Sequence, residues 1–117
     1  MAQHRTLLIV EDDPFIAMDM EWEFSDRGYK VVTASDPVSG ACALARALPD
    51  FAILDYNLGK DTSVSIARAL IDAKIPFIYV TGRPQAVVDD VSAPHAPIIP
   101  KPFNFDFLER TFLAAAA

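Results

Sequence analysis

The chain has 117 residues, of which 52% are hydrophobic, so it can form one domain with a single core and is too apolar for a disordered segment. The formal net charge is −6 and the basic residues are scattered, which excludes nonspecific binding to nucleic-acid phosphate. No apolar stretch approaches the roughly 20 residues that cross a bilayer, and residues 1–6 are polar, so we expect neither a membrane span nor a signal peptide.

The first expected strand spans residues 6–10. Asp13 and Pro14 follow it and suit the N-cap and the first position of a helix, which Gly28 ends. Apolar residues four positions apart predict the buried face of this helix: Ile16, Met20 and Phe24.

The second strand is expected at residues 30–34. Asp36 and Pro37 repeat the pattern of a cap followed by proline, and the helix that they begin should reach about residue 48. The lone Cys42 lies in this helix, where we expect a buried small hydrophobic residue rather than a reactive thiol. A single cysteine and the absence of a targeting segment favour the cytoplasm.

The third strand should span residues 51–54, followed by a polar loop at 57–61 that contains Gly59. A helix is expected at about residues 62–73, and a fourth strand at 77–80. Four apolar positions predict the buried face of this third helix: Val64, Ala67, Leu70 and Ile71.

The fourth helix must be short, about residues 84–91, because Pro94 and Pro97 follow closely. A fifth strand is expected at residues 97–99 and a fifth helix at 105–114, capped by Asn104, with Leu108 and Phe112 facing inward. Strands that alternate with helices predict a flavodoxin-like (βα)5 three-layer sandwich, α/β in class, with a parallel five-stranded sheet in the order 2-1-3-4-5.

Three carboxylates lie where this topology brings strands one and three together. Glu11 and Asp12 directly follow the first strand and Asp55 directly follows the third. Oxygen ligands with room for water suit Mg²⁺, and no His or Cys is placed with them for zinc. We expect His4 and His95, in a terminus and a proline-rich loop, to be surface residues.

A carboxylate can also attack a phosphoryl group and form an aspartyl phosphate. The transition state spreads negative charge over three oxygens, which a cation, the Lys101 ammonium and the Thr81 hydroxyl could neutralise. Taken singly, Asp55 could cap a turn, Thr81 could be an ordinary strand-end residue and Lys101 could be solvated. Their joint position at the ends of different strands favours phosphoryl chemistry.

Four segments together resemble the receiver domain of two-component response regulators over essentially the whole chain, residues 1–117: Val10-Glu11-Asp12-Asp13-Pro14, Leu54-Asp55-Tyr56-Asn57-Leu58, Val80-Thr81-Gly82 and Lys101-Pro102-Phe103. The resemblance implies a phosphoacceptor switch rather than a conventional enzyme. Asp55 would accept phosphate from a phosphohistidine of a sensor histidine kinase or a histidine phosphotransfer protein, with Mg²⁺ as cofactor.

The resemblance also implies roles for the neighbours of Asp55. Asp12 would bind Mg²⁺ directly and Glu11 largely through water, with Asp55 and the backbone carbonyl of Asn57 as further ligands. Thr81 would swing toward the phosphate and Lys101 would pair with it, and the Lys101–Pro102 peptide bond would be cis. We assign Asp13 to the helix cap.

The sequence departs from the family at the position three residues before the lysine. Most receivers have Tyr or Phe there, and this chain has Ile98, so coupling by rotation of an aromatic ring cannot operate through this residue. Residues 76–82 resemble the "FAT GUY" subgroup, often stand-alone receivers that lack this switch, although Arg83 and Pro84 fit its pattern less well. Gly82 is permissive backbone next to the phosphate, and an order–disorder change from Gly82 through the fourth helix could carry the response.

No output domain is expected, so output would be a protein contact or the flow of phosphate itself, with the chain a monomer or a weak dimer. Phe105 and Phe107 cannot both be buried with Leu108 and Phe112: they pack beside the loop or form an exposed aromatic patch for a partner. Phe15 and Met18, beside Pro102-Phe103, could form a kinase-docking surface.

Three other classes of protein fit the sequence less well. A haloacid-dehalogenase phosphatase has a second Asp two residues after its nucleophile, where this chain has Asn57, and 117 residues leave no room for a cap domain. In a flavodoxin the acidic loop would repel the FMN phosphate. A degenerate receiver that takes no phosphate is disfavoured because all the chemical positions are filled.

Overall fold

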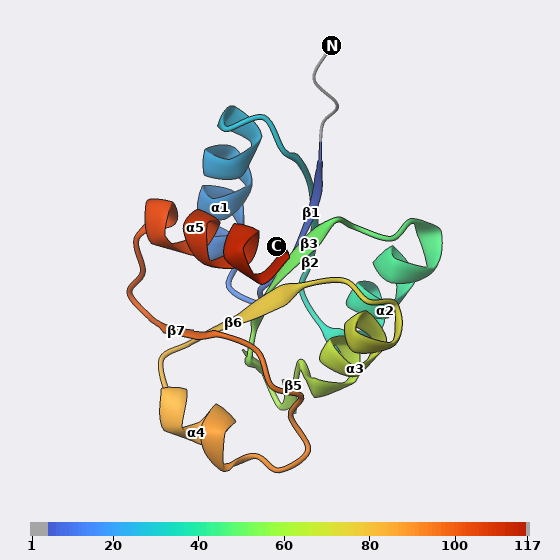
Figure 1. The fold of residues 1–117 in the computed structure, drawn as a ribbon, viewed down its shortest axis with the longest axis vertical. Helices are drawn as coiled ribbons and strands as arrows, with labels where there is room; N and C mark the ends of the chain where they lie inside the picture. Colours follow the sequence, from blue (N-terminus) through green and yellow to red (C-terminus); the bar gives the residue numbers. More distant parts are fainter. Residues whose placement is uncertain (1–4, 117) are drawn as a thin grey trace.

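A five-stranded parallel sheet forms the centre of the protein in the computed structural model, which describes residues 5–116 (Figure 1). The strand order is β2-β1-β3-β6-β7, which confirms the predicted order 2-1-3-4-5 and the flavodoxin-like class. The strands are β1 (Thr6–Val10), β2 (Lys30–Ala34), β3 (Phe51–Asp55), β6 (Phe77–Thr81) and β7 (Ile98–Pro100). β1, β3 and β6 are nearly continuous apolar runs because helices cover the sheet on both faces.

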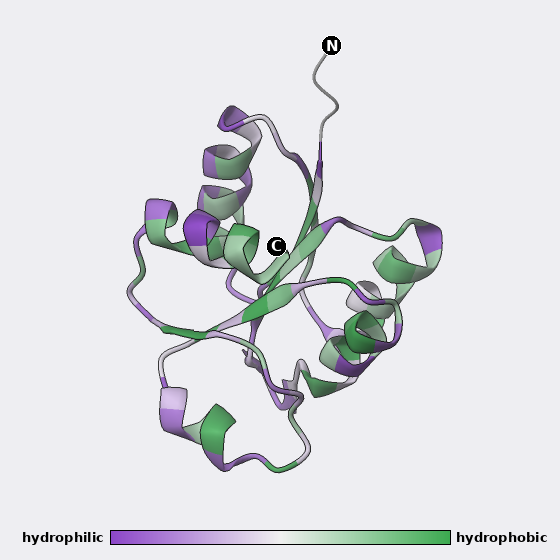
Figure 2. Cartoon of the chain, in the orientation of Figure 1, coloured by the Kyte–Doolittle hydropathy of each residue, from purple (hydrophilic) through white to green (hydrophobic). Residues whose placement is uncertain are grey.

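Five helices complete the three layers: α1 (Pro14–Asp26), α2 (Pro37–Arg46), α3 (Val64–Asp72), α4 (Pro84–Asp89) and α5 (Phe105–Ala116). α1 and α5 cover one face, where Met20, Phe24, Leu108 and Phe112 are buried against the sheet. α2, α3 and α4 pack on the other face. Figure 2 shows the hydrophobic residues concentrated along the central strands and on the inner sides of the helices.

The predicted helix caps are confirmed. Asp13 Oδ1 accepts hydrogen bonds from the backbone amides of Phe15 (2.9 Å) and Ile16 (3.3 Å), with Pro14 at the first helical position. Asp36 accepts from the amide of Ser39 (2.7 Å) and the Ser39 hydroxyl accepts in return, which forms a capping box. Asn104 Oδ1 accepts from the amide of Phe107 (3.0 Å).

The prediction of a plain polar loop at residues 57–61 was wrong. The segment is a short antiparallel hairpin of β4 (Asn57–Leu58) and β5 (Asp61–Thr62). Gly59 at its turn has a φ of 64°, a conformation that glycine adopts without steric cost. Two-residue strands give too little alternation for sequence pattern to distinguish them from a loop. Other element ends differ from the prediction by one or two residues, as at Arg46, where α2 ends.

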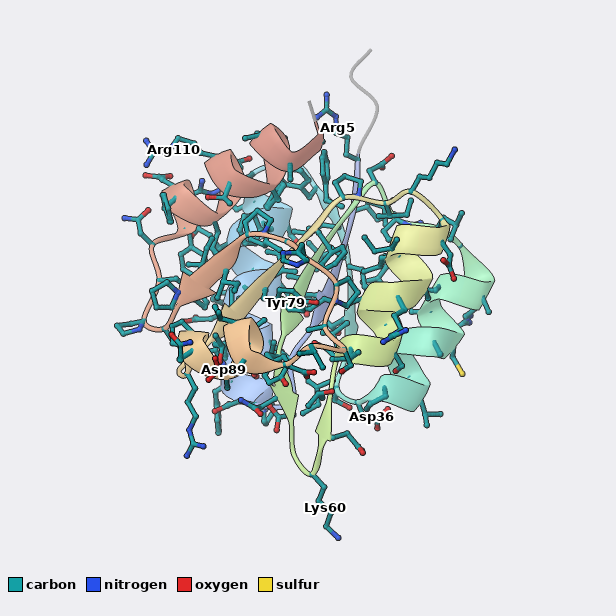
Figure 3. The ribbon with its side chains drawn as sticks, turned by 60° about the horizontal axis from the view of Figure 1, so that its bottom comes forward. Arg5, Asp36, Lys60, Tyr79, Asp89 and Arg110 are labelled. Atoms are coloured by element: carbon teal, nitrogen blue, oxygen red, sulfur yellow. The ribbon has the colours of Figure 1, made fainter. Side chains whose placement is uncertain are left out.

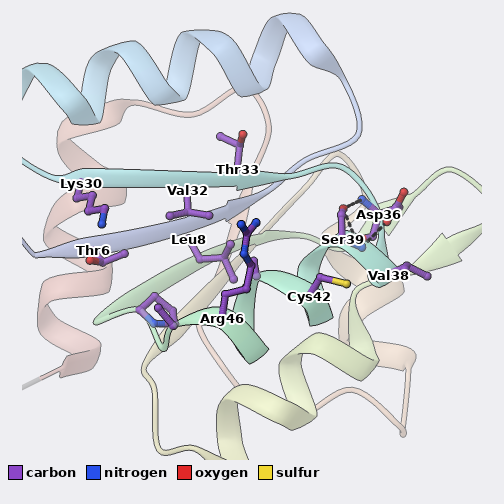
Figure 4. A pocket seen from close by; sticks show the side chains of 13 residues that line it. Thr6, Leu8, Lys30, Val32, Thr33, Asp36, Val38, Ser39, Cys42 and Arg46 are labelled. Carbon is purple, nitrogen blue, oxygen red and sulfur yellow. Dashed lines mark hydrogen bonds between the residues drawn. The ribbon is translucent and has the colours of Figure 1, made fainter.

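Two residues expected in the core are exposed. Cys42 lies in the outer part of α2, where this helix and the edge strand β2 border a groove of about 680 Å³ (Figure 4). Ile71 is half exposed because Ile66, Ala67 and Leu70 already fill the inward face of α3. His95 is exposed as predicted, and the prediction for His4 lies outside the described residues. None of the helices in residues 5–116 is long and apolar enough to cross a membrane.

Candidate functional site

The predicted site residues meet at the carboxyl end of the sheet, the end that comes forward in Figure 3. Glu11 and Asp12 follow β1, Asp55 is the last residue of β3 and Thr81 the last of β6. Lys101 follows β7. Because parallel strands all end at the same edge, residues far apart in sequence come together here.

Three carboxylates form the acidic part of the site. One oxygen from each of Glu11, Asp12 and Asp55 lies within 4.8 Å of the others. Glu11 is 2% and Asp55 5% exposed, whereas Asp12 is exposed and accepts a hydrogen bond from the backbone amide of Gly59 (3.0 Å). Buried carboxylates at this separation repel one another, and a hard divalent cation with oxygen ligands would relieve that repulsion. The donor set therefore fits Mg²⁺.

Lys101 supplies the positive charge of the site. Its Nζ lies 3.0 Å from Glu11 Oε1 and 3.0 Å from Asp55 Oδ2. Burial alone would lower the pKa of the ammonium, but its hydrogen bonds to Asp55 and Glu11 outweigh burial and raise this pKa above its ordinary value. Lys101 thus stays charged beside the carboxylate that we expect to react.

Glu11 is the titrating member of the site. Burial, and after it a hydrogen bond between protonated Glu11 and Asp55, raise its pKa to about 7. The backbone amide of Asp13 and the Lys101 ammonium favour the ionised form and oppose this shift. Protonated Glu11 lowers the repulsion within the cluster when no cation is bound.

Mg²⁺ affinity should therefore rise with pH until Glu11 is ionised. When the pH is below the pKa of Glu11, which is about 7, binding of the cation must displace the proton from this carboxyl. We expect the dissociation constant for Mg²⁺ to fall by up to about tenfold per unit from roughly pH 5.5 to 6.5. It should level off above the pKa of Glu11. Titrations followed by NMR at constant ionic strength measure this change.

The same group sets a pH dependence of metal-free stability. The pKa of Glu11 is higher in the folded chain than its ordinary value of 4.5, so folding binds a proton between that value and about 7. The free energy of unfolding should fall as pH rises through this window. Glu11→Gln should remove both pH dependences, and an unchanged Mg²⁺ slope in this variant would contradict the assignment to Glu11.

Thr81 and Gly82 lie beside the acids. Thr81 is fully buried, and its hydroxyl accepts a hydrogen bond from the backbone amide of Arg83 (2.9 Å). The Thr81 carbonyl accepts from the amide of Lys101 (2.8 Å), which ties the ends of β6 and β7 together. Gly82 has no positive φ, and a Cβ there would meet nothing within 4 Å, so this conformation does not require glycine. The Lys101–Pro102 peptide bond is cis, as predicted.

The residues predicted for partner surfaces divide into exposed and packed groups. Phe15 is 76% exposed and Met18 is exposed on the same side of α1. On α5, Phe107 is 48% exposed while Phe105 packs edge-on against Phe24, which confirms that the two rings are not both buried. Ile98 is half-buried and pairs in register with Tyr79 across β6 and β7.

Tyr56 and Asp90 are contacts of the site that the sequence did not predict. Tyr56, between Asp55 and Asn57, is buried and donates a hydrogen bond from its hydroxyl to Asp90 Oδ2 at the C-terminal end of α4. This bond and burial raise the pKa of Tyr56 to about 12, so the phenol stays protonated. Asn57 lies in β4, and the role of its carbonyl as a metal ligand stays a prediction.

Residues 7–112 match the family model described as "Response regulator receiver domain". The chain belongs to this family. The receiver is 31% identical over 106 residues to the transcriptional regulatory protein DltR of Streptococcus agalactiae, covering 87% of this chain and 47% of that protein. It is 28% identical over 104 residues to PhoP of Escherichia coli K12, covering 86% and 47%. The chain thus spans about half the length of these curated relatives.

Solved structures of receivers share the fold. The PhyR receiver domain of Erythrobacter litoralis superimposes with a TM-score of 0.84 at 22% identity, covering 96% of this chain and 89% of that one. TrrA of Thermotoga maritima, solved with Mg²⁺ and BeF, gives 0.79 at 23% identity over 95% and 98%. A Burkholderia pseudomallei response regulator with a phosphorylated aspartic acid and calcium gives 0.85 at 21% identity over 96% and 68%.

Family membership defines the general role of the receiver. The chain is a phosphoacceptor domain of two-component signalling rather than a conventional enzyme. Membership of this family also implies a cognate histidine kinase. The cluster of Glu11, Asp12 and Asp55 is typical of the Mg²⁺ site of receivers.

Proposed function

We propose that Asp55 is the residue that accepts the phosphoryl group. The observation that carries this proposal is the position of its buried carboxylate, 3.0 Å from the Lys101 ammonium and within 4.8 Å of the oxygens of Glu11 and Asp12. An Asp55 oxygen would form a bond to phosphorus as the bond from phosphorus to the histidine nitrogen of the donor breaks. The imidazole leaves with the electron pair of that bond, and Asp55 becomes an acyl phosphate.

The neighbours of Asp55 would neutralise the charge of the transferring group. Asp12, Asp55, the Asn57 carbonyl and, largely through water, Glu11 would hold Mg²⁺, which supplies positive charge for one phosphoryl oxygen. Lys101 would exchange its bond to Asp55 for a bond to a second oxygen. The Thr81 hydroxyl would turn from the Arg83 amide toward the third.

A phosphotransfer screen against the histidine kinases and histidine phosphotransfer proteins of the source organism tests this function. With Mg²⁺ present, we expect labelled phosphate to move from one of these donors to the receiver, through an acyl phosphate that hydroxylamine cleaves. Asp55→Asn should take no label. Label retained by this variant would overturn the assignment of Asp55.

Phe15 and Met18 would contact the phosphate donor. Both are exposed on α1, and Met18 lines a groove together with Glu11 and Asp12 of the site. A large exposed aromatic residue at this place suits an anchor for a partner helix. A donor protein bound to this surface would then also reach the Asp55 carboxylate.

Phe15→Ala should slow phosphotransfer from the kinase about tenfold or more and leave phosphorylation by acetyl phosphate within about twofold. The small donor does not need the docking surface. Rates of both reactions, measured in parallel, test this. Val38→Ala is the matched control, because Val38 is equally exposed but lies on α2, on the opposite face of the sheet. Equal slowing of both reactions by Phe15→Ala would count against docking.

The receiver would act in the cytoplasm as a regulator of the FAT GUY type. With Ile98 half-buried where most receivers have an aromatic ring, the response would be an order–disorder change that begins at Gly82 and involves α4. Output would then be a contact with a downstream protein or the flow of phosphate. Backbone NMR with and without Mg²⁺ and beryllofluoride tests this: unchanged shifts and relaxation over residues 82–97 would exclude it.

A further inference from the structure

Helix α4 is tied at both ends to residues next to the acidic cluster. At its start, the backbone amide of Arg83 donates to the Thr81 hydroxyl (2.9 Å). At its end, Asp90 accepts a hydrogen bond from the Tyr56 hydroxyl. Thr81 ends β6, and Tyr56 directly follows Asp55 at the end of β3. The short helix is therefore bonded to residues at the ends of two strands, β6 and β3, that both contribute to the site.

The anchor at Tyr56 is rigid. Its ring is 7% exposed and packs edge-on against Tyr79 with 6.3 Å between the ring centroids. Its backbone amide donates to the carbonyl of Val80 (3.1 Å), and its carbonyl accepts from the amide of Ser63 (2.9 Å). The side chain of Tyr56 is thus held by the core, and its hydroxyl is a fixed point for α4.

Asp90 joins this fixed point to the chain beyond α4. Its other oxygen, Oδ1, accepts from the amide of Ser92 (2.9 Å) and from the Ser92 hydroxyl. The carbonyl of Asp90 accepts from the amide of Ala93 (3.1 Å), and the Ser92 carbonyl accepts from Arg68 of α3 (2.9 Å). These bonds make the turn at residues 90–93 one connected unit, fastened to β3 through Tyr56.

The two anchors differ in what phosphorylation would do to them. A Thr81 hydroxyl that turns toward a phosphoryl group on Asp55 can no longer accept from the amide of Arg83, so the start of α4 is released. The Tyr56 hydroxyl is bonded to Asp90 rather than to a residue of the acidic cluster, so phosphorylation of Asp55 need not break this bond. One end of α4 is therefore freed while the other stays attached.

We propose that the hydrogen bond between Tyr56 and Asp90 is the pivot about which α4 moves when Asp55 is phosphorylated. This inference rests on the proposed function of Asp55 and Thr81. The bond confines the change to the start of α4 and keeps residues 90–93 in place. Tyr56 is a positioning residue in this scheme, because it acts on α4 and touches no phosphoryl oxygen.

Amide hydrogen exchange of the full chain, with and without Mg²⁺ and beryllofluoride, tests the pivot. In the wild type, the exchange rate of the Arg83 amide should rise about tenfold on addition, while that of Ala93 changes less than about twofold. In Tyr56→Phe, which keeps the ring and loses the hydroxyl, the rate of Ala93 should also rise about tenfold on addition. An unchanged rate of Ala93 in this variant would overturn the proposal.

Tyr79→Phe is the matched control. The Tyr79 ring is also buried, and its hydroxyl donates to the Pro94 carbonyl in the same segment (2.8 Å), so the variant removes an equivalent bond away from Asp90. It should respond as the wild type does, and loss of protection at Ala93 there would overturn the pivot. Asp90→Ala, which leaves the core intact, should reproduce Tyr56→Phe at the Ala93 amide and provides the test if Tyr56→Phe fails to fold.

Different results would overturn the proposed function and the pivot. A wild type that takes no label in the phosphotransfer screen and binds no beryllofluoride would remove the proposed function and the pivot with it. A wild type that binds beryllofluoride but exchanges Ala93 as fast as Arg83 would overturn the pivot alone.

Discussion

A Lys101→Met variant should accept phosphate from acetyl phosphate about 100-fold more slowly than the wild type, or slower still. The Lys101 ammonium is 3.0 Å from Asp55 Oδ2, close enough to meet a phosphoryl oxygen bound to that carboxylate. Methionine keeps the length and the apolar stem of the side chain and removes only the charge and the donors. The lost rate therefore reports the stabilisation of transition-state charge. Quenched-flow or fluorescence kinetics at saturating Mg²⁺ measure it.

Lys60→Met is the control for this experiment. Lys60 lies at the turn of the hairpin of β4 and β5 and points away from the body of the protein (Figure 3). It carries the same charge on the segment that follows Asp55 but lies outside the acidic cluster, so this variant should react within about twofold of the wild type. Similar rates for Lys101→Met and the wild type would show that this ammonium has no role in the reaction.

Lys101 also illustrates what the sequence could predict about the site. Buried apolar runs that end in Asp55, Thr81 and Lys101 are enough to place these residues at one edge, because parallel strands in alternation with helices all end on the same side. The predicted sheet order then brings Glu11 beside Asp55. No side-chain geometry is needed for this step, so the prediction depends on topology alone.

The pattern of residues in the sequence could not predict contacts that depend on the direction of side chains. Tyr56 and Asp90 are 34 positions apart, and nothing in either segment marks them as partners. Their bond depends on where the short helix α4 ends, which is the least predictable property of an element. Cys42 was misplaced for a related reason: α2 covers an edge strand, so less of its surface is buried than periodicity implies.

The two faces of the sheet have separate tasks in the proposed scheme. The α1 side carries the exposed Phe15, and its Met18 lines a groove with Glu11 and Asp12, where phosphate would arrive. The opposite side carries α4, whose anchors Thr81 and Tyr56 adjoin Asp55. Asp55 can therefore accept phosphate from a donor on the α1 side, and α4 can change conformation on the opposite side, without any motion of the core.

That rigidity can be tested where α2 meets α3. Gly40→Val should destabilise the receiver by about 3 kcal/mol, which corresponds to a fall in Tm of roughly 10 °C. Gly40 is buried, and a Cβ at this position would lie 2.4 Å from Ile66 Cδ1 and 3.2 Å from Ile66 Cγ1. A branched side chain must displace Ile66 or push α2 away from α3, and the closely packed interior resists either shift. Urea denaturation followed by circular dichroism gives the free energy.

Ile66→Ala should rescue this variant, because valine adds three carbons at the point where alanine removes three. Ile66→Ala alone leaves a cavity and should cost about 2–4 kcal/mol. The double variant should be more stable than the sum of the two single changes predicts, by about 1–3 kcal/mol. Gly82→Val, where a Cβ meets nothing within 4 Å, should change stability by less than about 0.5 kcal/mol. Additive costs for Gly40→Val and Ile66→Ala would mean that these two residues do not share one space.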